Sequence, residues 1–157
     1  MPRTTATLAA GFLVLSAGAA FSPAHGQDVS TNWFRDVALS PDGKTIVFVH
    51  AGDLYTVPAS GGRAVPLTVS PAYESRPVWS HDGKYIAFAS DRHGNDDVFV
   101  MPAAGGTATR LTFHEAPDVP SDFTTDNKAV IFESTRLDDV KSPLFPDASY
   151  SELYKVS

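Results

Sequence analysis

The chain has 157 residues and a formal net charge of −6, and its basic residues are scattered along the sequence. Nucleic acid and anionic membrane surfaces both require a clustered basic face, so we expect neither as a partner. The composition, 43% hydrophobic and 19% charged, predicts one packed domain and excludes extensive disorder.

Residues 1–26 read as a secretory signal peptide. The apolar run Leu8–Phe21 follows Arg3 and is shorter than the roughly 20 residues that a membrane-spanning helix needs. Ala24 and Gly26 supply the small residues that a signal peptidase recognises. We therefore expect export to the periplasm or the extracellular space, with no membrane attachment after cleavage; an uncleaved anchor is the alternative. The sequence has no cysteine, which excludes disulfides and a lipid-modified N-terminus.

The rest of the chain repeats one segment three times. SPDGKTIVF begins at Ser40, SHDGKYIAF at Ser80 and TTDNKAVIF at Thr124. An acid-apolar-aromatic step follows each copy, and a glycine pair and a Leu-Thr step then close the first two. A repeat of about 40 residues with strand-like runs is typical of stacked repeat architectures.

Each polar turn is predicted to be a tight two-residue hairpin, because Asp-Gly and Asp-Asn tolerate a positive φ. The aspartates at the turns are expected to accept hydrogen bonds from nearby backbone amides. The strand after each turn is apolar on both faces, so both faces should be covered. These strands are Thr45–Val49, Tyr85–Ala89 and Ala129–Phe132.

Four short antiparallel strands per repeat predict an all-β fold, a partial β-propeller of about three four-stranded blades, the third incomplete. The expected order is a signal peptide (1–26), a lead-in (27–35) and blades over 36–70, 76–113 and 118–157. No segment has a useful helical period. Because propellers close with about 4–8 blades, we expect this chain to be the N-terminal portion of a longer protein, its remaining blades being partners of this segment.

The repeats differ mainly in the loop between their second and third strands. This loop is Ala51-Gly52 in the first repeat, Asp91–Asp96 in the second and Thr135–Ser151 in the third. Loops that vary on a rigid scaffold are where recognition tends to reside. Leu144 and Phe145 in the third loop could form a docking surface or pack on their own blade.

We predict no catalytic, cofactor-binding or metal-binding residue in this segment, and no cofactor. The histidines show no shared ligand spacing, and the acidic run from Asp91 to Asp97 lacks the order and the terminal glutamate of a calcium loop. No nucleophile elbow or phosphate-binding loop occurs. We expect Trp33, Trp79, Phe88 and Phe123 to be core residues.

The middle repeat resembles the WD-like propeller repeat found in TolB and in tricorn-type peptidases. The resemblance rests on Pro77-x-Trp79-Ser80-x-Asp82-Gly83-Lys84, followed by Ser90-Asp91-Arg92 and by Arg110-Leu111-Thr112. It covers about residues 36–157, although the first repeat lacks the proline and the tryptophan, and the third has Phe123 and Asn127 in place of tryptophan and glycine.

The resemblance implies the non-catalytic propeller of an exported tricorn-like serine peptidase, which admits or filters peptide or protein substrates for a catalytic domain absent here. No residue matches a catalytic motif of that family. Two alternatives remain: a TolB-like periplasmic propeller that binds envelope proteins, and the propeller of an oligopeptidase or amidohydrolase fusion. Sequence beyond residue 157 would separate them.

Overall fold

The computed structural model describes residues 34–136 and 151–157. The chain divides into two compact units, residues 1–30 and 31–157, and every described residue belongs to the second. The described residues form strands and turns, and none of them lies in a helix that could span a membrane. The predicted signal peptide, Trp33, Leu144 and Phe145 lie outside the described residues.

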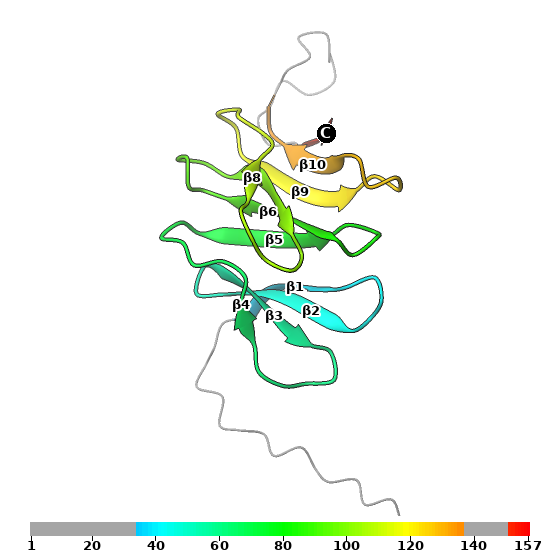
Figure 1. Ribbon diagram of the computed structural model, residues 1–157. Helices are drawn as coiled ribbons and strands as arrows, with labels where there is room; N and C mark the ends of the chain where they lie inside the picture. Colours follow the sequence, from blue (N-terminus) through cyan, green and yellow to red (C-terminus); the bar gives the residue numbers. More distant parts are fainter. Residues whose placement is uncertain (1–33, 137–150) are drawn as a thin grey trace, which may run out of the picture. The chain divides into compact units, whose positions relative to one another are not determined.

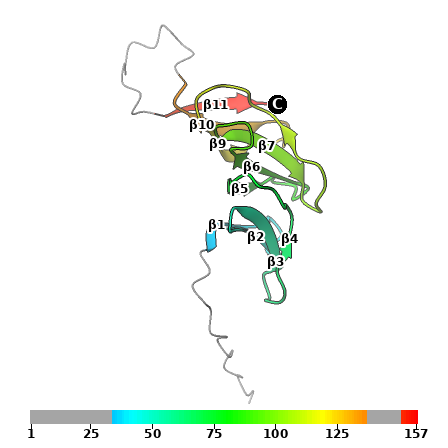
Figure 2. The same ribbon diagram turned by 90° about the vertical axis from the view of Figure 1, so that its left-hand side faces the viewer.

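In the described residues, eleven strands form three separate antiparallel sheets, which we call the first, second and third blades (Figure 1). Within each blade, strands that are consecutive in sequence pair with one another (Figure 2). The first blade contains β1 (Phe34–Leu39), β2 (Thr45–His50), β3 (Asp53–Pro58) and β4 (Val65–Pro66). The second contains β5 (Glu74–Trp79), β6 (Tyr85–Ser90), β7 (Asp97–Pro102) and β8 (Thr109–Arg110). The third contains β9 (Asp118–Phe123), β10 (Val130–Ser134) and β11 (Glu152–Val156).

This arrangement confirms the predicted all-β fold, a partial β-propeller with a third blade of three strands. The strands of the first and second blades begin two residues before the predicted blade starts, at Phe34 and Glu74. The reason is the register of the ladder, in which Phe34 pairs with His50 and Glu74 with Ser90. Pairing therefore extends into the segment predicted as a lead-in.

The turns between the first two strands of each blade are longer than predicted. The backbone amide of Ser40 donates to the carbonyl oxygen of Thr45 at 2.8 Å, which leaves four residues in the loop instead of two. Asp42 accounts for the difference, because its carboxylate accepts from the Ser40 hydroxyl at 2.7 Å and from the Lys44 amide at 3.0 Å. A two-residue loop has no room for both bonds. The residue after the aspartate does adopt the expected positive φ, 71° at Gly43.

Asp82 closes the equivalent turn of the second blade, and its contacts predict that thermal stability depends on pH. The Ser80 hydroxyl, then the Lys84 amide, lower the pKa of Asp82 to about 2. A folded-state pKa below the unfolded value stabilises the fold above pH 3.8, and this stabilisation disappears as the pH falls through about 2. We therefore expect Asp82→Asn to lower the melting temperature at neutral pH, and the difference from the wild type to shrink toward pH 2.

Thermal unfolding followed by circular dichroism across this pH range tests the prediction. Glu115→Gln is the matched control, because Glu115 is exposed and its neutralisation removes the same charge without a turn contact. A melting-temperature difference for Asp82→Asn that stays constant from neutral pH to pH 2 would contradict a lowered pKa of Asp82 as its cause.

The core lies between the blades. Val49 and Leu54 of the first blade pack against Phe88, Phe99 and Met101 of the second. A second cluster joins the second blade to the third: Ala87, Val98, Phe123, Val130 and Phe132. These contacts confirm that β6 is covered on both faces. In β10, by contrast, Ile131 is only half-buried, so burial alternates along the last described middle strand. Phe88 and Phe123 are core residues as predicted, and Trp79 is half-buried.

Candidate functional site

The first strands of the three blades, β1, β5 and β9, lie next to one another and form what we call the axial strands. A bulge interrupts β1 at Asp36 and β5 at Arg76, and both residues have a positive φ, 49° and 51°. Such a conformation is uncommon outside glycine and often marks a functional or structural constraint. Here the Arg76 amide donates to Asp36 Oδ2 at 3.1 Å, which ties the two strands together.

Charged side chains are exposed along the axial strands, and β1 also exposes the apolar side chains of Phe34, Val37 and Leu39. Arg35 and Arg76 bring positive charge, and Asp122 brings negative charge. Arg35 also donates to the Tyr73 hydroxyl at 3.4 Å. These charged and hydrogen-bonding groups can bind polar groups such as a peptide main chain.

A buried carboxylate joins the first blade to the second. Glu74 is fully buried and accepts a hydrogen bond from the Thr68 hydroxyl of the first blade. Arg92 pairs with it at 2.7 Å, and the guanidinium lies 4.3 Å from the centroid of the Phe99 ring. Burial raises the pKa of Glu74, and Thr68 and Arg92 oppose that increase. The ion pair of Glu74 and Arg92 therefore lies within the second blade, and the hydrogen bond from Thr68 connects it to the first blade.

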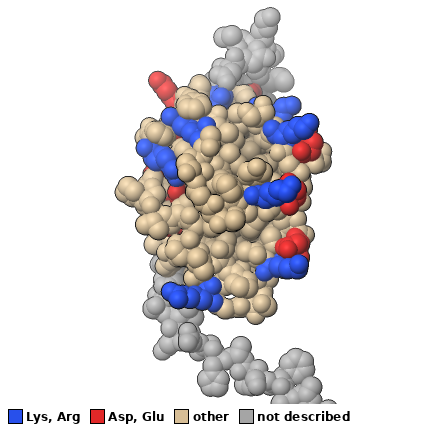
Figure 3. All heavy atoms as spheres, viewed as in Figure 1, with Lys and Arg blue, Asp and Glu red and all other residues tan. Residues whose placement is uncertain are grey.

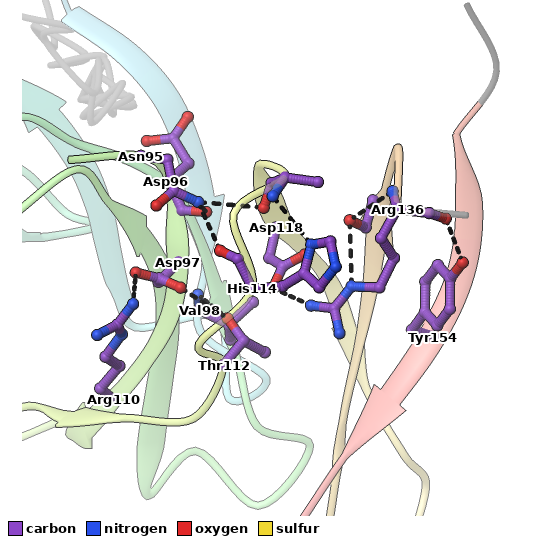
Figure 4. A network of polar contacts seen from close by, with 12 residues as sticks. Asn95, Asp96, Asp97, Val98, Arg110, Thr112, His114, Asp118, Arg136 and Tyr154 are labelled. Carbon is purple, nitrogen blue, oxygen red and sulfur yellow. Dashed lines mark hydrogen bonds and ion pairs between the residues drawn. The ribbon is translucent and has the colours of Figure 1, made fainter. Parts of the chain in front are cut away.

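The third blade repeats this pair with Asp118 and Arg136 (Figure 4). The Arg136 guanidinium lies 5.0 Å from the Phe132 ring centroid and 5.2 Å from that of Tyr154. Asp97 forms a further buried pair with Arg110 at 2.6 Å. The ladder register places Phe34 of the first blade opposite His50, where the other two blades have their acid opposite a serine. The first blade thus replaces the carboxylate by an aromatic ring.

A cavity of about 560 Å³, which we call the turn-end cavity, lies between the first and second blades beside the four-residue turns. Its lining includes the carboxylate residues Asp42 and Asp82, the hydroxyl residues Thr45 and Thr56, and the half-buried Trp79. The indole nitrogen of Trp79 donates to the carbonyl oxygen of Ala38 at 3.3 Å, which fixes the ring in place. The volume is that of a small-ligand or side-chain site.

The acidic loop of the second blade is held by contacts with the protein itself. The side-chain amide of Asn95 donates to the carbonyl oxygens of His114, at 2.9 Å, and of Ala116, at 3.1 Å (Figure 4). Burial, and then the nearby charges of Asp91 and Asp97, raise the pKa of Asp96. These contacts fit the predicted hairpin.

The described histidines contact different parts of the fold. His50 packs against the rings of Phe34 and Tyr55, whereas the Nε2 atom of His81 lies 3.0 Å from the carbonyl oxygen of Phe123. His93 stacks on Phe99. Among residues 34–136 and 151–157, no group of histidine and acidic side chains could hold a metal ion.

Sequence reasoning did not identify the buried acid–arginine pairs, although the sequence carries a signal for them. Glu74 and Arg92 both recur 44 residues later, as Asp118 and Arg136. The acid and the arginine are 18 residues apart and come into contact only through strand pairing. Motifs around the turns therefore do not reveal an acid that begins a strand.

Three antiparallel sheets packed face to face through their apolar strands define a segment of a β-propeller. The chain belongs to the family of the tricorn protease N-terminal beta propeller domain, whose model matches residues 31–146.

Two curated relatives are peptidases. The chain is 40% identical over 67 residues to the uncharacterized peptidase YuxL of Bacillus subtilis, a match that covers 40% of this chain and 10% of that protein. It is 36% identical over 70 residues to dipeptidyl-peptidase 5 of Porphyromonas gingivalis, covering 38% and 10%. The matches thus span about a tenth of the length of each relative.

Solved structures share the fold. TolB from Acinetobacter baumannii superposes with a TM-score of 0.58 at 21% identity, covering 77% of this chain and 29% of that one. The tricorn protease superposes with a TM-score of 0.55 at 18% identity, covering 66% and 11%. At these identities the likeness establishes the propeller architecture alone.

Proposed function

We propose that this chain is the non-catalytic, substrate-binding propeller of a tricorn-like peptidase. The family membership over residues 31–146 is the observation that carries the proposal. The axial strands support it, since they expose the charged side chains of Arg35, Arg76 and Asp122 to a passing peptide. The propeller binds peptide segments and admits them to a catalytic domain supplied by another part of the parent protein.

The proposal includes export. The apolar run after Arg3 and the small residues before position 27 support transport to the periplasm or beyond, where such a peptidase would meet unfolded polypeptides. Fractionation of an expressing bacterium, with mass determination of the recovered chain, tests this part. A cytoplasmic chain that retains residues 1–26 would contradict it.

Peptide binding is tested directly with the purified chain. We expect a fluorescein-labelled unstructured polypeptide to bind, as an increase in fluorescence anisotropy, and to remain intact on prolonged incubation. A folded protein carrying the same label is the control and should leave the anisotropy unchanged. Absence of binding to the unstructured chain would contradict the proposal, and so would specific cleavage of it.

A further inference from the structure

The turn-end cavity has an equivalent between the second and third blades, and the two differ in chemistry. Thr45, Thr56 and Trp79 line the turn-end cavity. The residues at the same repeat positions line the second cavity: Tyr85, Val100 and Phe123. Two hydroxyl side chains and an indole in one cavity are thus replaced by a phenol, an aliphatic side chain and a benzene ring in the other.

The replacements also change the size. The turn-end cavity measures about 560 Å³ and the second cavity about 270 Å³. A tyrosine in place of a threonine fills space that the first interface leaves open. Because the two interfaces are built from the same repeat, packing alone does not require a large polar cavity at the first of them.

Negative charge lines the turn-end cavity. Asp42 and Asp82 contribute carboxylates, and hydrogen bonds from Ser40 and Ser80 are the largest causes that lower their pKa values. Both groups therefore stay ionised at neutral pH. No lysine or arginine is among the described residues that line the cavity; His81 also lines it, with its Nε2 atom 3.0 Å from the carbonyl oxygen of Phe123.

Each carboxylate has a lysine partner on the solvent side. Lys44 lies 3.7 Å from Asp42 and Lys84 lies 3.1 Å from Asp82, and both lysine side chains are more than 70% exposed. The turns concerned lie along the right-hand edge in Figure 1, the edge where Figure 3 shows basic and acidic side chains next to one another. Exposed ion pairs of this kind are weak, so a cation from a ligand can replace the lysine.

We propose that the turn-end cavity binds the lysine or arginine side chain of a peptide substrate. The cation lies between the carboxylates of Asp42 and Asp82 and against the indole of Trp79, where cation–π attraction adds to the ionic one. The hydroxyl oxygens of Thr45 and Thr56 accept hydrogen bonds from the remaining N–H groups of the cation. The inference rests on the proposed peptide-binding function and gives it a specificity for basic residues.

Two unstructured peptides that differ at one central residue test the specificity. One carries arginine, and the other carries citrulline, which has nearly the same shape without the charge. Binding is followed by the fluorescence of Trp79 in a Trp33→Phe background, because the chain has only these two tryptophans. We expect the arginine peptide to bind at least about tenfold more tightly than the citrulline peptide.

Variants of the cavity separate this site from the rest of the propeller. Asp82→Asn should lower the affinity for the arginine peptide to that for the citrulline peptide. Asp126→Asn is the matched control: Asp126 makes the same turn contacts in the third blade but does not line the cavity, so affinity should be unchanged. Thr45→Tyr, which copies the residue of the second cavity and leaves the turn carboxylates in place, should abolish the preference for arginine.

The outcomes distinguish the two proposals. Equal binding of the arginine and citrulline peptides, or an arginine preference that survives both Asp82→Asn and Thr45→Tyr, would overturn the basic side-chain site while peptide binding stands. Failure of both peptides to bind, measured by the anisotropy of a fluorescein label and not by Trp79 fluorescence alone, would overturn the peptide-binding function itself.

Discussion

Arg92→Met should lower the free energy of unfolding at pH 7 by about 3–5 kcal/mol, because it leaves a buried carboxylate without its counter-charge. Glu74 is fully buried between the first two blades, and the Arg92 guanidinium lies 2.7 Å from its Oε1 atom. Methionine keeps much of the apolar packing against Phe99, so the loss reports mainly on the charge. Urea denaturation followed by circular dichroism measures it.

The pH dependence identifies the cause of that loss. Burial already raises the pKa of Glu74, and removal of the opposing guanidinium raises it further. A raised folded-state pKa means that stability is fully present below the unfolded value of 4.5 and is lost as the pH rises through the folded value. The deficit of Arg92→Met should therefore be small at pH 4 and grow toward pH 7.

Two further variants serve as controls. Glu74→Gln combined with Arg92→Met should recover much of the stability, because a neutral amide still offers an acceptor to the Thr68 hydroxyl. Arg63→Met removes an exposed arginine and should change the free energy of unfolding by no more than about 0.5 kcal/mol. A deficit for Arg92→Met that is independent of pH, or that equals the deficit of Arg63→Met, would contradict a buried ion pair.

The three copies of the repeat explain how much of the fold the sequence predicts. Asp42, Asp82 and Asp126 occupy the same place before an apolar run, and a pattern that recurs three times reflects the repeating unit of the fold. The order of the strands within each blade and the three blades of the described residues follow from it. The length of the turns does not, since Asp-Gly occurs in two-residue hairpins and also in the four-residue loops found here.

The features of the site depend on contacts that the repeat does not encode. Glu74 meets Arg92 only because β5 and β6 pair in one register, and it meets Thr68 only because two blades stack. The turn-end cavity likewise combines Thr45 and Thr56, from two strands of one blade, with Trp79 from the next. Such sites require the spacing between sheets, which no linear pattern in a single sequence provides.

Phe88→Ala should lower the free energy of unfolding by about 3–5 kcal/mol, the cost of a large cavity in a packed core. Phe88 is fully buried, and its ring stacks on that of Phe99 with the centroids 5.8 Å apart. It lies in the cluster that joins the first and second blades. If the blades are stable only through one another, the loss should appear in a single cooperative transition of both blades and not in the second blade alone.

Phe113→Ala is the matched control, since Phe113 is 71% exposed and its main contact is the guanidinium of Arg110, 4.6 Å from the ring centroid. That truncation should lower the free energy of unfolding by no more than about 1 kcal/mol. Hydrogen exchange then separates cooperative unfolding of both blades from local unfolding of one. In Phe88→Ala, protection should fall together in β2 and β6, because Val49 and Leu54 of the first blade lose the same partner. A loss of protection confined to β6 would mean that the first blade is stable without its neighbour, and the mutual packing on which the propeller interpretation depends would then be wrong.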